Sequence, residues 1–171
     1  MSSGDEQEKR RILNVYNSYK QKQYQNIKWS NNFIGNQYIF NERLQTVKKI
    51  ILDNNIDLSN AKILEIGCAG GDVIDLLIKV GAQENNIYGI DIRKEKLQYV
   101  KNKFPDCHFQ IMDVKNMKYP ENHFDLITAF TLFSSILDSD FQLQSVKEIC
   151  KVLKPGGKIL LYDFRFNNPF N

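Results

Sequence analysis

Cysteine and long apolar runs are both scarce in this chain of 171 residues. The three cysteines, Cys68, Cys107 and Cys150, include no CxxC pair. An odd number of scattered thiols favours neither a disulfide framework nor a zinc site. No run approaches the ~18 apolar residues of a membrane-spanning helix, and the polar start MSSGDEQEKRR is unlike a signal peptide. We therefore expect reduced thiols, a cytoplasmic location, no bound metal and no membrane span.

A strong excess of charge of either sign is also missing. The net charge is +3, with 25% charged and 42% hydrophobic residues, which is typical of a soluble globular protein. A balance this mild does not indicate a dedicated nucleic-acid binder, so we expect no nucleic-acid partner. A chain of this length is most simply one domain that buries about two-thirds of its unfolded surface.

The first 60 residues are polar and read as a helical extension. Apolar residues recur at helical spacing from Arg10 to about Tyr24, which predicts a first helix. Residues 26–41 are rich in aromatics and asparagine without a clean period, and we expect an ordered loop there. Asn41 is a candidate N-cap for a second helix. Its apolar face would be Leu44, Val47, Ile50 and Ile51, and DNNIDLSN would end it.

From residue 61 onward, strand-sized apolar runs alternate with helix-sized segments. The runs are KILEIG, NIYGIDI, CHFQIMDV, FDLITAF and KILLYDF. Three helical faces lie between them, namely Val73, Ile74, Leu76, Leu77 and Val80, then Leu97, Val100 and Phe104, then Leu143, Val146, Ile149, Cys150 and Leu153. Strands that are apolar throughout indicate a sheet covered on both faces. The pattern predicts a doubly wound, mostly parallel α/β domain of about five strands over residues 61–171, with residues 1–60 as an extension or lid.

The turn after the first strand, ILEIGCAGGD, carries three glycines between two acids. Ligands of doubly wound sheets bind at the carboxyl ends of the strands, where this turn would lie. A phosphate-binding loop is disfavoured because no lysine follows Gly71, and a dinucleotide site is disfavoured because Ala69 and Asp72 stand where GxGxxG needs glycine. The acids Glu65 and Asp72 favour a ligand with a cationic or zwitterionic group. A turn that merely joins strand to helix remains the structural alternative.

Two more acids are expected at the same edge of the sheet. Asp91 ends NIYGIDI, one strand–helix–strand unit after Glu65, and an acid there can accept hydrogen bonds from both hydroxyls of a ribose. Asp113, in IMDV at the end of the third strand, could accept from an adenine amino group. Each acid alone is more often a strand-end cap, so the prediction rests on the three acids occurring together.

These residues resemble the class I S-adenosylmethionine-dependent methyltransferases over roughly residues 62–164. ILEIGCAGG resembles the first motif of that family, E/D-x-G-x-G-x-G, with Ala69 at the middle glycine and Gly70 as an additional glycine. HFDLITAFTLFSSI and EICKVLKPGGKILLYDF resemble its fourth-strand and fifth-strand segments. The cofactor contacts that the resemblance implies are Glu65, Gly67, Cys68, Ala69, Gly71, Asp91, Ile92, Met112, Asp113, Val114 and Phe130.

The resemblance implies methyl transfer from S-adenosylmethionine, with S-adenosylhomocysteine as product. The expected acceptor is a small molecule or a glycan or lipid-linked precursor. Asp163, as a base, and Arg165, as an anchor for an acidic acceptor, are the weak catalytic candidates; ordinary strand-end charges are the alternative. The alternative function is a truncated or non-catalytic cofactor-binding domain. A nicotinamide-dependent oxidoreductase shares the fold class but would need a different glycine spacing.

The family sheet has seven strands, and no residues follow the fifth strand here to form its last antiparallel pair. The fifth strand would then be an open edge, which is prone to pairing with another chain. We expect either a longer native product or cover for this edge, by the N-terminal extension or by a homodimer.

Overall fold

A computed structural model of the protein describes residues 3–21 and 34–164. The chain forms two compact units, residues 1–57 and 58–171. The role of the first unit as an extension or lid stays a prediction.

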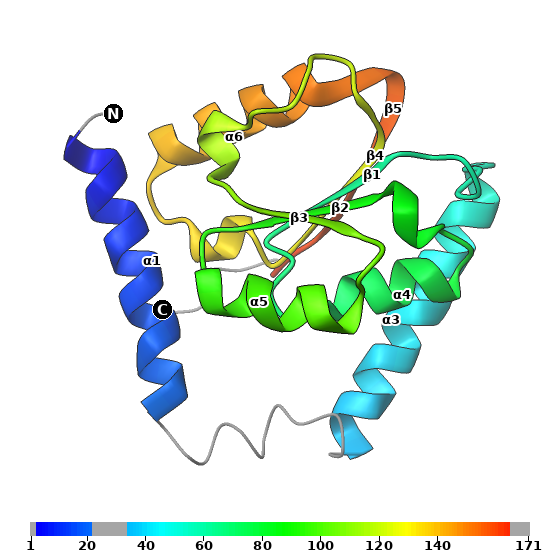
Figure 1. Ribbon diagram of the computed structural model, residues 1–171, viewed down its shortest axis with the longest axis horizontal. Helices are drawn as coiled ribbons and strands as arrows, with labels where there is room; N and C mark the ends of the chain where they lie inside the picture. The colour runs from blue at the N-terminus through cyan, green and yellow to red at the C-terminus, as the bar shows by residue number, and fades with distance from the viewer. Residues whose placement is uncertain (1–2, 22–33, 165–171) are drawn as a thin grey trace. The chain divides into compact units, whose positions relative to one another are not determined.

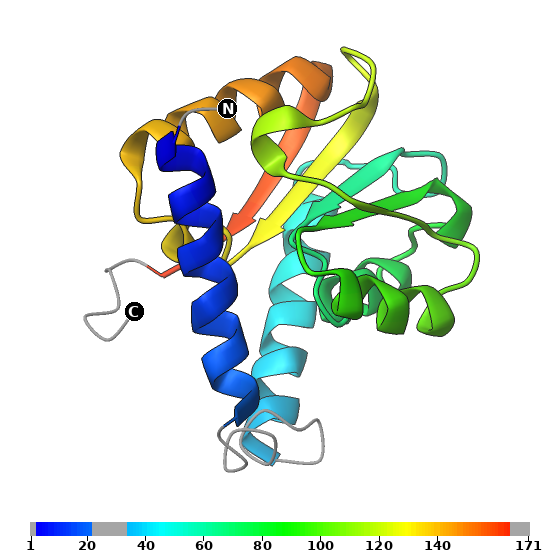
Figure 2. The same ribbon diagram turned by 60° about the vertical axis from the view of Figure 1, so that its left-hand side comes forward.

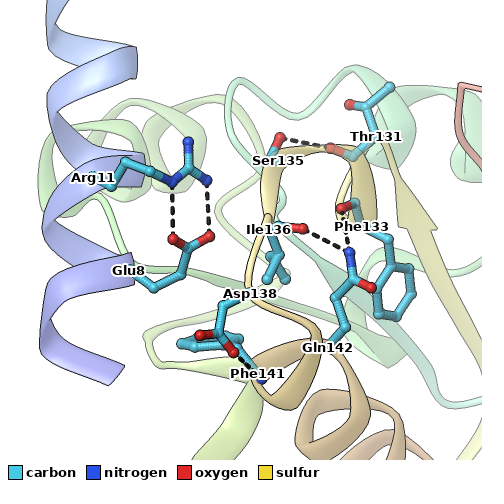
Figure 3. Close-up of polar contacts among 9 residues, drawn as sticks. All are labelled: Glu8, Arg11, Thr131, Phe133, Ser135, Ile136, Asp138, Phe141 and Gln142. Atoms are coloured by element: carbon cyan, nitrogen blue, oxygen red, sulfur yellow. Dashed lines mark hydrogen bonds and ion pairs between the residues drawn. The ribbon is translucent and has the colours of Figure 1, made fainter. Parts of the chain in front are cut away.

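The first unit contains two helices, α1 (Ser3–Gln21) and α3 (Ile34–Asp53). In α1 the Arg11 guanidinium forms two hydrogen bonds of 2.8 Å with the Glu8 carboxylate, three residues away (Figure 3). The prediction of an N-cap at Asn41 is wrong, because α3 already begins at Ile34 and Asn41 lies inside it. The predicted loop over 26–41 is wrong from Ile34 onward, and its earlier part lies outside the described residues. Aromatic and asparagine side chains hid the helical period there.

The second unit is built on a five-stranded sheet in the order β3-β2-β1-β4-β5, in which every pairing is parallel (Figure 1). Its strands are β1 (Ile63–Ile66), β2 (Ile87–Asp91), β3 (His108–Ile111), β4 (Phe124–Phe130) and β5 (Leu153–Tyr162). The chain order reverses between β1 and β4, which makes their carboxyl ends the switch point of the sheet. The predicted doubly wound parallel fold is confirmed.

Three helices and three short 3-10 turns connect the strands. They are α4 (Asp72–Lys79), η1 (Glu84–Asn86), α5 (Lys94–Lys103), η2 (Val114–Asn116), η3 (Phe133–Ser135) and α6 (Ser139–Val152). Figure 1 shows α4 and α5 on one face of the sheet and α6 on the other. The predicted faces of the first two helices are confirmed at Ile74, Leu76 and Leu77 in α4 and at Leu97 and Val100 in α5, all of which are buried.

The core lies along the two central strands. All four residues of β1 are buried, and six of the seven in β4 are buried. The expectation of a sheet covered on both faces therefore holds at its centre. It fails at both edges, since Phe109 is the only buried residue of β3 and β5 has none.

The predicted apolar face of α6 is partly wrong. The helix buries Phe141, Ser145, Ile149 and Val152. Leu143 and Val146, which the pattern placed in the core, are exposed by 55% and 42%. The buried serine explains the error, because Ser145 satisfies its hydroxyl by donating to the Phe141 carbonyl at 2.8 Å and so tolerates the core.

The fifth strand also begins earlier than KILLYDF predicts. Leu153 already pairs with Phe124, and the register then shifts so that Lys158 pairs with Leu126. The Pro-Gly-Gly turn lies within this irregular start, where Gly156 has a φ of +79°. Figure 2 shows β4 beside β5. Among the described residues of this unit, β4 is the only strand that pairs with β5.

Within residues 3–21 and 34–164, no helix is both long and apolar enough to cross a lipid bilayer. No group of three or more potential metal ligands occurs in the same described ranges.

Candidate functional site

The glycine turn after β1 is held against the end of β2 by its backbone. The N–H groups of Gly67 and Cys68 both donate to the Ile90 carbonyl, at 2.8 and 3.0 Å, and Gly71 N donates to the Cys68 carbonyl at 2.8 Å. Gly67, Ala69 and Gly71 have φ angles of +79°, +38° and +82°. Positive φ angles of this kind favour glycine, which occupies two of the three positions. Ala69, at the third, adopts a positive φ although it carries a side chain.

Packing explains why the third glycine of the turn cannot carry a side chain. A Cβ atom on Gly71 would lie 2.6 Å from Phe104 Cε2 and 2.7 Å from Val100 Cγ2, which belong to α5 and its end. A Cβ atom on Gly70 would have no neighbour within 4 Å. The turn therefore packs closely on one side and presents uncovered backbone on the other.

Asp91, at the end of β2, lies beside this turn and is only 4% exposed. Its Oδ2 accepts the Ala69 N–H at 3.0 Å, and its Oδ1 accepts the Arg93 N–H at 2.8 Å. The Arg93 side chain adds two more bonds, from Nε to Oδ1 at 3.0 Å and from Nη2 to Oδ2 at 2.9 Å. The predicted ribose acid is therefore in contact with the predicted glycine turn, and in this structure it is paired with an arginine.

Glu65 lies deep in the sheet and is only 1% exposed. Burial raises the pKa of this carboxyl well above its usual value, and the hydrogen bond that it accepts from the Thr128 hydroxyl opposes the shift only in part. Thr128 stands opposite Glu65 in the β1–β4 register. A buried carboxyl of raised pKa is a poor anchor for a cation, so the charge argument from the sequence is weakened at Glu65. Asp72, at the start of α4, is exposed.

Cys68 lies in the glycine turn and is 4% exposed. Burial, followed by the nearby carboxylates of Asp91 and Glu65, raises the pKa of this thiol far above its ordinary value. The thiol is therefore neutral at physiological pH and is not a nucleophile. Any contact that Cys68 makes with a ligand would be through its backbone or as a small apolar surface.

The segment after β3 also meets Asp91. Met112 N donates to the Asp91 carbonyl at 3.2 Å. Asp113 caps η2 by accepting the Lys115 N–H at 3.0 Å, and Val114 is buried. The strand itself ends at Ile111, so Asp113 lies two residues beyond it. The half-buried Asp113 thus has a structural partner as well as its predicted place at the ligand edge.

The fourth strand ends at Phe130, a residue that is 9% exposed and whose ring stacks on that of Tyr162 at 5.3 Å between centroids. The chain then folds into a compact loop, shown in Figure 3, in which Ser135 Oγ donates to the Thr131 carbonyl at 3.0 Å. Gln142 Nε2 ties the loop to α6 by donating to the carbonyls of Phe133 and Ile136, at 3.2 and 2.6 Å.

Asp163 follows β5 and holds this loop. Its Oδ2 accepts the Ser134 N–H at 3.1 Å, and its Oδ1 accepts the Phe164 N–H at 2.8 Å. These bonds give it a structural role, and its catalytic role stays a prediction. Arg165 lies outside the described residues.

The structure thus links the glycine turn, Asp91 and Met112 directly by hydrogen bonds. Ile92 follows Asp91 and is half-buried.

Two residues of the site were not predicted from the sequence, Arg93 and Thr128. A polar residue inside the apolar run FDLITAF was a signal for Thr128. Nothing in the sequence pattern distinguished Arg93 from the other basic residues that follow it.

Residues 57–170 match the methyltransferase domain family, and the chain belongs to this family. The prediction of a class I S-adenosylmethionine-dependent methyltransferase domain is thereby confirmed, together with its cofactor class. The fold agrees with a solved structure described as an S-adenosylmethionine-dependent methyltransferase from Clostridium acetobutylicum. That likeness has a TM-score of 0.64 at 20% identity, and it covers 86% of this chain and 56% of the other.

Two curated relatives are named for methylation of quinone precursors. A demethylmenaquinone methyltransferase of Staphylococcus saprophyticus is 28% identical over 140 residues, which are 80% of this chain and 58% of the relative. A ubiquinone/menaquinone biosynthesis C-methyltransferase of Vibrio cholerae is 28% identical over 119 residues, or 64% of this chain and 45% of the relative. The chain therefore spans about half the length of the curated relatives it matches.

Proposed function

We propose that the protein transfers a methyl group from S-adenosylmethionine to a small-molecule acceptor. The observation that carries this proposal is the meeting of the glycine turn with the buried carboxylate of Asp91, through the 3.0 Å bond from Ala69 N. Uncovered backbone at Gly70 leaves room for a ligand beside them. Asp91 would hold the ribose, and the turn would lie against the amino-acid part of the cofactor.

S-adenosylmethionine supplies an already electrophilic methyl group when it is bound. The work left to the protein is to bind and orient the reactants and to exclude water, and orientation alone can contribute ~7–11 kcal/mol. A general base is needed only for an acceptor that must lose a proton. Asp163 as this base and Arg165 as an anchor remain predictions. Each would be supported if its replacement abolished turnover while cofactor affinity was retained.

The acceptor class that we propose is a phenol or reduced quinone precursor. The names of the two curated relatives support this choice, and glycan or lipid-linked precursors remain the broader class.

A turnover measurement tests the proposed acceptor class directly. The chain is incubated with S-adenosylmethionine, with and without a reduced naphthoquinone, and S-adenosylhomocysteine is measured. Acceptor-dependent product supports the proposal. Binding of S-adenosylhomocysteine without turnover of this acceptor would contradict the quinone class, and absence of turnover with glycan and lipid-linked acceptors as well would favour the non-catalytic cofactor-binding domain.

A second copy of the chain is the partner that we propose for the β5 edge. Ile159 and Leu161 of β5 are exposed by 41% and 54%, and Leu143 and Val146 of α6 are exposed as well. Within the described part of this unit, β5 pairs with β4 alone. An apolar open edge favours pairing with an identical edge in a two-fold dimer.

We also propose that the protein is cytoplasmic. This location rests on the three free cysteines, Cys68, Cys107 and Cys150, because thiols stay reduced in that compartment.

A further inference from the structure

The carboxylate of Asp91 has no acceptor site left in this structure. Each oxygen accepts two hydrogen bonds. Oδ1 receives the Arg93 N–H and Nε, and Oδ2 receives the Ala69 N–H and the Arg93 Nη2, all within 2.8–3.0 Å. Two carboxylate oxygens offer about four acceptor sites. A ribose hydroxyl that donates to Asp91 must therefore displace a donor that is already there.

The four donors differ in how easily they can leave. The N–H groups of Ala69 and Arg93 are backbone groups, fixed by the glycine turn and by the start of α5. The guanidinium of Arg93 is carried on a side chain with rotatable bonds, and it supplies one bond to each oxygen. Its departure would free one acceptor site on each oxygen, which is what two neighbouring ribose hydroxyls require.

We propose that Arg93 is an internal competitor of the cofactor ribose and sets the affinity of the site by occupying the two acceptor positions of Asp91. This inference rests on the proposed cofactor-binding function and identifies a residue that limits it. The ion pair between Asp91 and Arg93 is well shielded from solvent, since the two side chains are only 3% and 11% exposed. A two-pronged charge-assisted pair of this kind is among the stronger polar interactions in proteins.

The competition lowers the observed affinity by the fraction of molecules in which Arg93 has left Asp91. Removal of the guanidinium also leaves a buried carboxylate with two unfilled acceptor sites, which the ligand would then satisfy. Both effects act in the same direction. Loss of Arg93 should therefore destabilise the ligand-free protein and strengthen its binding of a ribose-bearing ligand.

The test is a calorimetric titration of the whole chain with S-adenosylhomocysteine. Arg93→Ala should bind about tenfold more tightly than the wild type, equivalent to about 1.4 kcal/mol, while its ligand-free melting temperature falls. Arg93→Met, which keeps much of the side-chain volume and carries no hydrogen-bond donor, serves the same purpose if Arg93→Ala does not fold. The matched control is Lys154→Ala, which removes an ion pair of 2.7 Å with Asp125 near the amino-terminal ends of β5 and β4, and it should leave the affinity unchanged.

A second ligand separates competition from a general structural effect. The 2′,3′-dideoxy analogue of S-adenosylhomocysteine cannot donate to Asp91, so its affinity should be the same for the wild type and Arg93→Ala. Equal or weaker binding of S-adenosylhomocysteine by folded Arg93 variants would overturn the competitor role and leave the proposed function intact. The same gain for both ligands would also overturn it. Failure of the folded wild-type chain to bind S-adenosylhomocysteine would overturn the proposed function and this inference together.

Discussion

At the scale of single residues, Gly70 and Gly71 adjoin in the same turn but have opposite surroundings. Gly71 has a φ of +82°, and a Cβ atom there would press on Phe104 and Val100 of the α5 region. A Cβ atom on Gly70 would meet open space. One glycine is thus required by the packing of the second unit, whereas the other leaves backbone uncovered where the ligand is expected.

Gly71→Ala should therefore lower the free energy of unfolding by about 2–4 kcal/mol, through overpacking and an unfavourable φ. Gly70→Ala is the matched control and should change it by no more than about 0.5 kcal/mol. Urea unfolding followed by circular dichroism measures both. Equal losses in the two variants would contradict the packing that assigns them different roles.

His123 provides a pH dependence that can be measured. Burial, with the nearby charges of Lys62 and Lys154, lowers the pKa of this imidazole, and Asp125 opposes the shift only in part. A lowered pKa means that the unfolded chain takes up this proton more readily than the folded one. The contribution of His123 to stability is therefore present above the unfolded pKa of about 6.5 and is lost as the pH falls below it.

His123→Phe keeps an aromatic ring beside Tyr119 and Phe124 and removes the titrating group. Between pH 7.5 and pH 5.5, values chosen to lie about one unit on either side of the usual His pKa, the melting temperature should fall less in this variant than in the wild type. Differential scanning calorimetry in two buffers gives the comparison. An identical fall in both proteins would show that His123 does not contribute.

At the scale of elements, α6 begins with a side-chain cap that the structure makes explicit. Asp138 Oδ1 accepts the Phe141 N–H at 2.7 Å (Figure 3). Asp138→Ala should cost about 1 kcal/mol of unfolding free energy. Asp140→Ala, an exposed acid in the same first turn, should cost less than about 0.5 kcal/mol. If the two substitutions prove equivalent in urea unfolding, the cap does not stabilise α6.

Elements with a strong local pattern were predictable from the sequence. The run FDLITAF gives β4 its observed bounds, because its residues are apolar almost throughout and polar residues flank them. The start of α3 was not predictable, since Ile34–Asn41 shows no helical period in the sequence. The face of α6 was misread because Ser145, a polar residue, lies on the buried side.

The candidate site was likewise predictable from the sequence only in part. The glycine turn and Asp91 were predictable because strand ends and turn residues are visible in one sequence. The pairing of Arg93 with Asp91 depends on side-chain direction, which no periodicity encodes. The contact between Glu65 and Thr128 depends on strand register, which places residues of β1 and β4 opposite each other only once the sheet is formed.

At the scale of the whole molecule, the open edge of the sheet at β5 predicts that two copies of the chain associate. Wild-type protein should sediment as a dimer across a concentration series, and Leu161→Glu should shift it to the mass of one chain because it places a charge on the apolar edge. Tyr99→Glu is the control, since Tyr99 is similarly exposed, by 60%, but lies on α5. A wild type that stays monomeric throughout would contradict the proposed dimer.

The central claim is that the second unit binds the adenosyl cofactor through Asp91, and calorimetric titration with S-adenosylhomocysteine tests it most directly. Wild-type protein should bind with micromolar affinity, and Asp91→Ala should weaken binding more than tenfold, a loss above ~1.4 kcal/mol. Asp125→Ala, which removes a carboxylate near the amino-terminal end of β4, away from the carboxyl ends of the strands, should bind like the wild type. No binding by a folded wild-type chain, or unchanged affinity in folded Asp91→Ala, would contradict the claim.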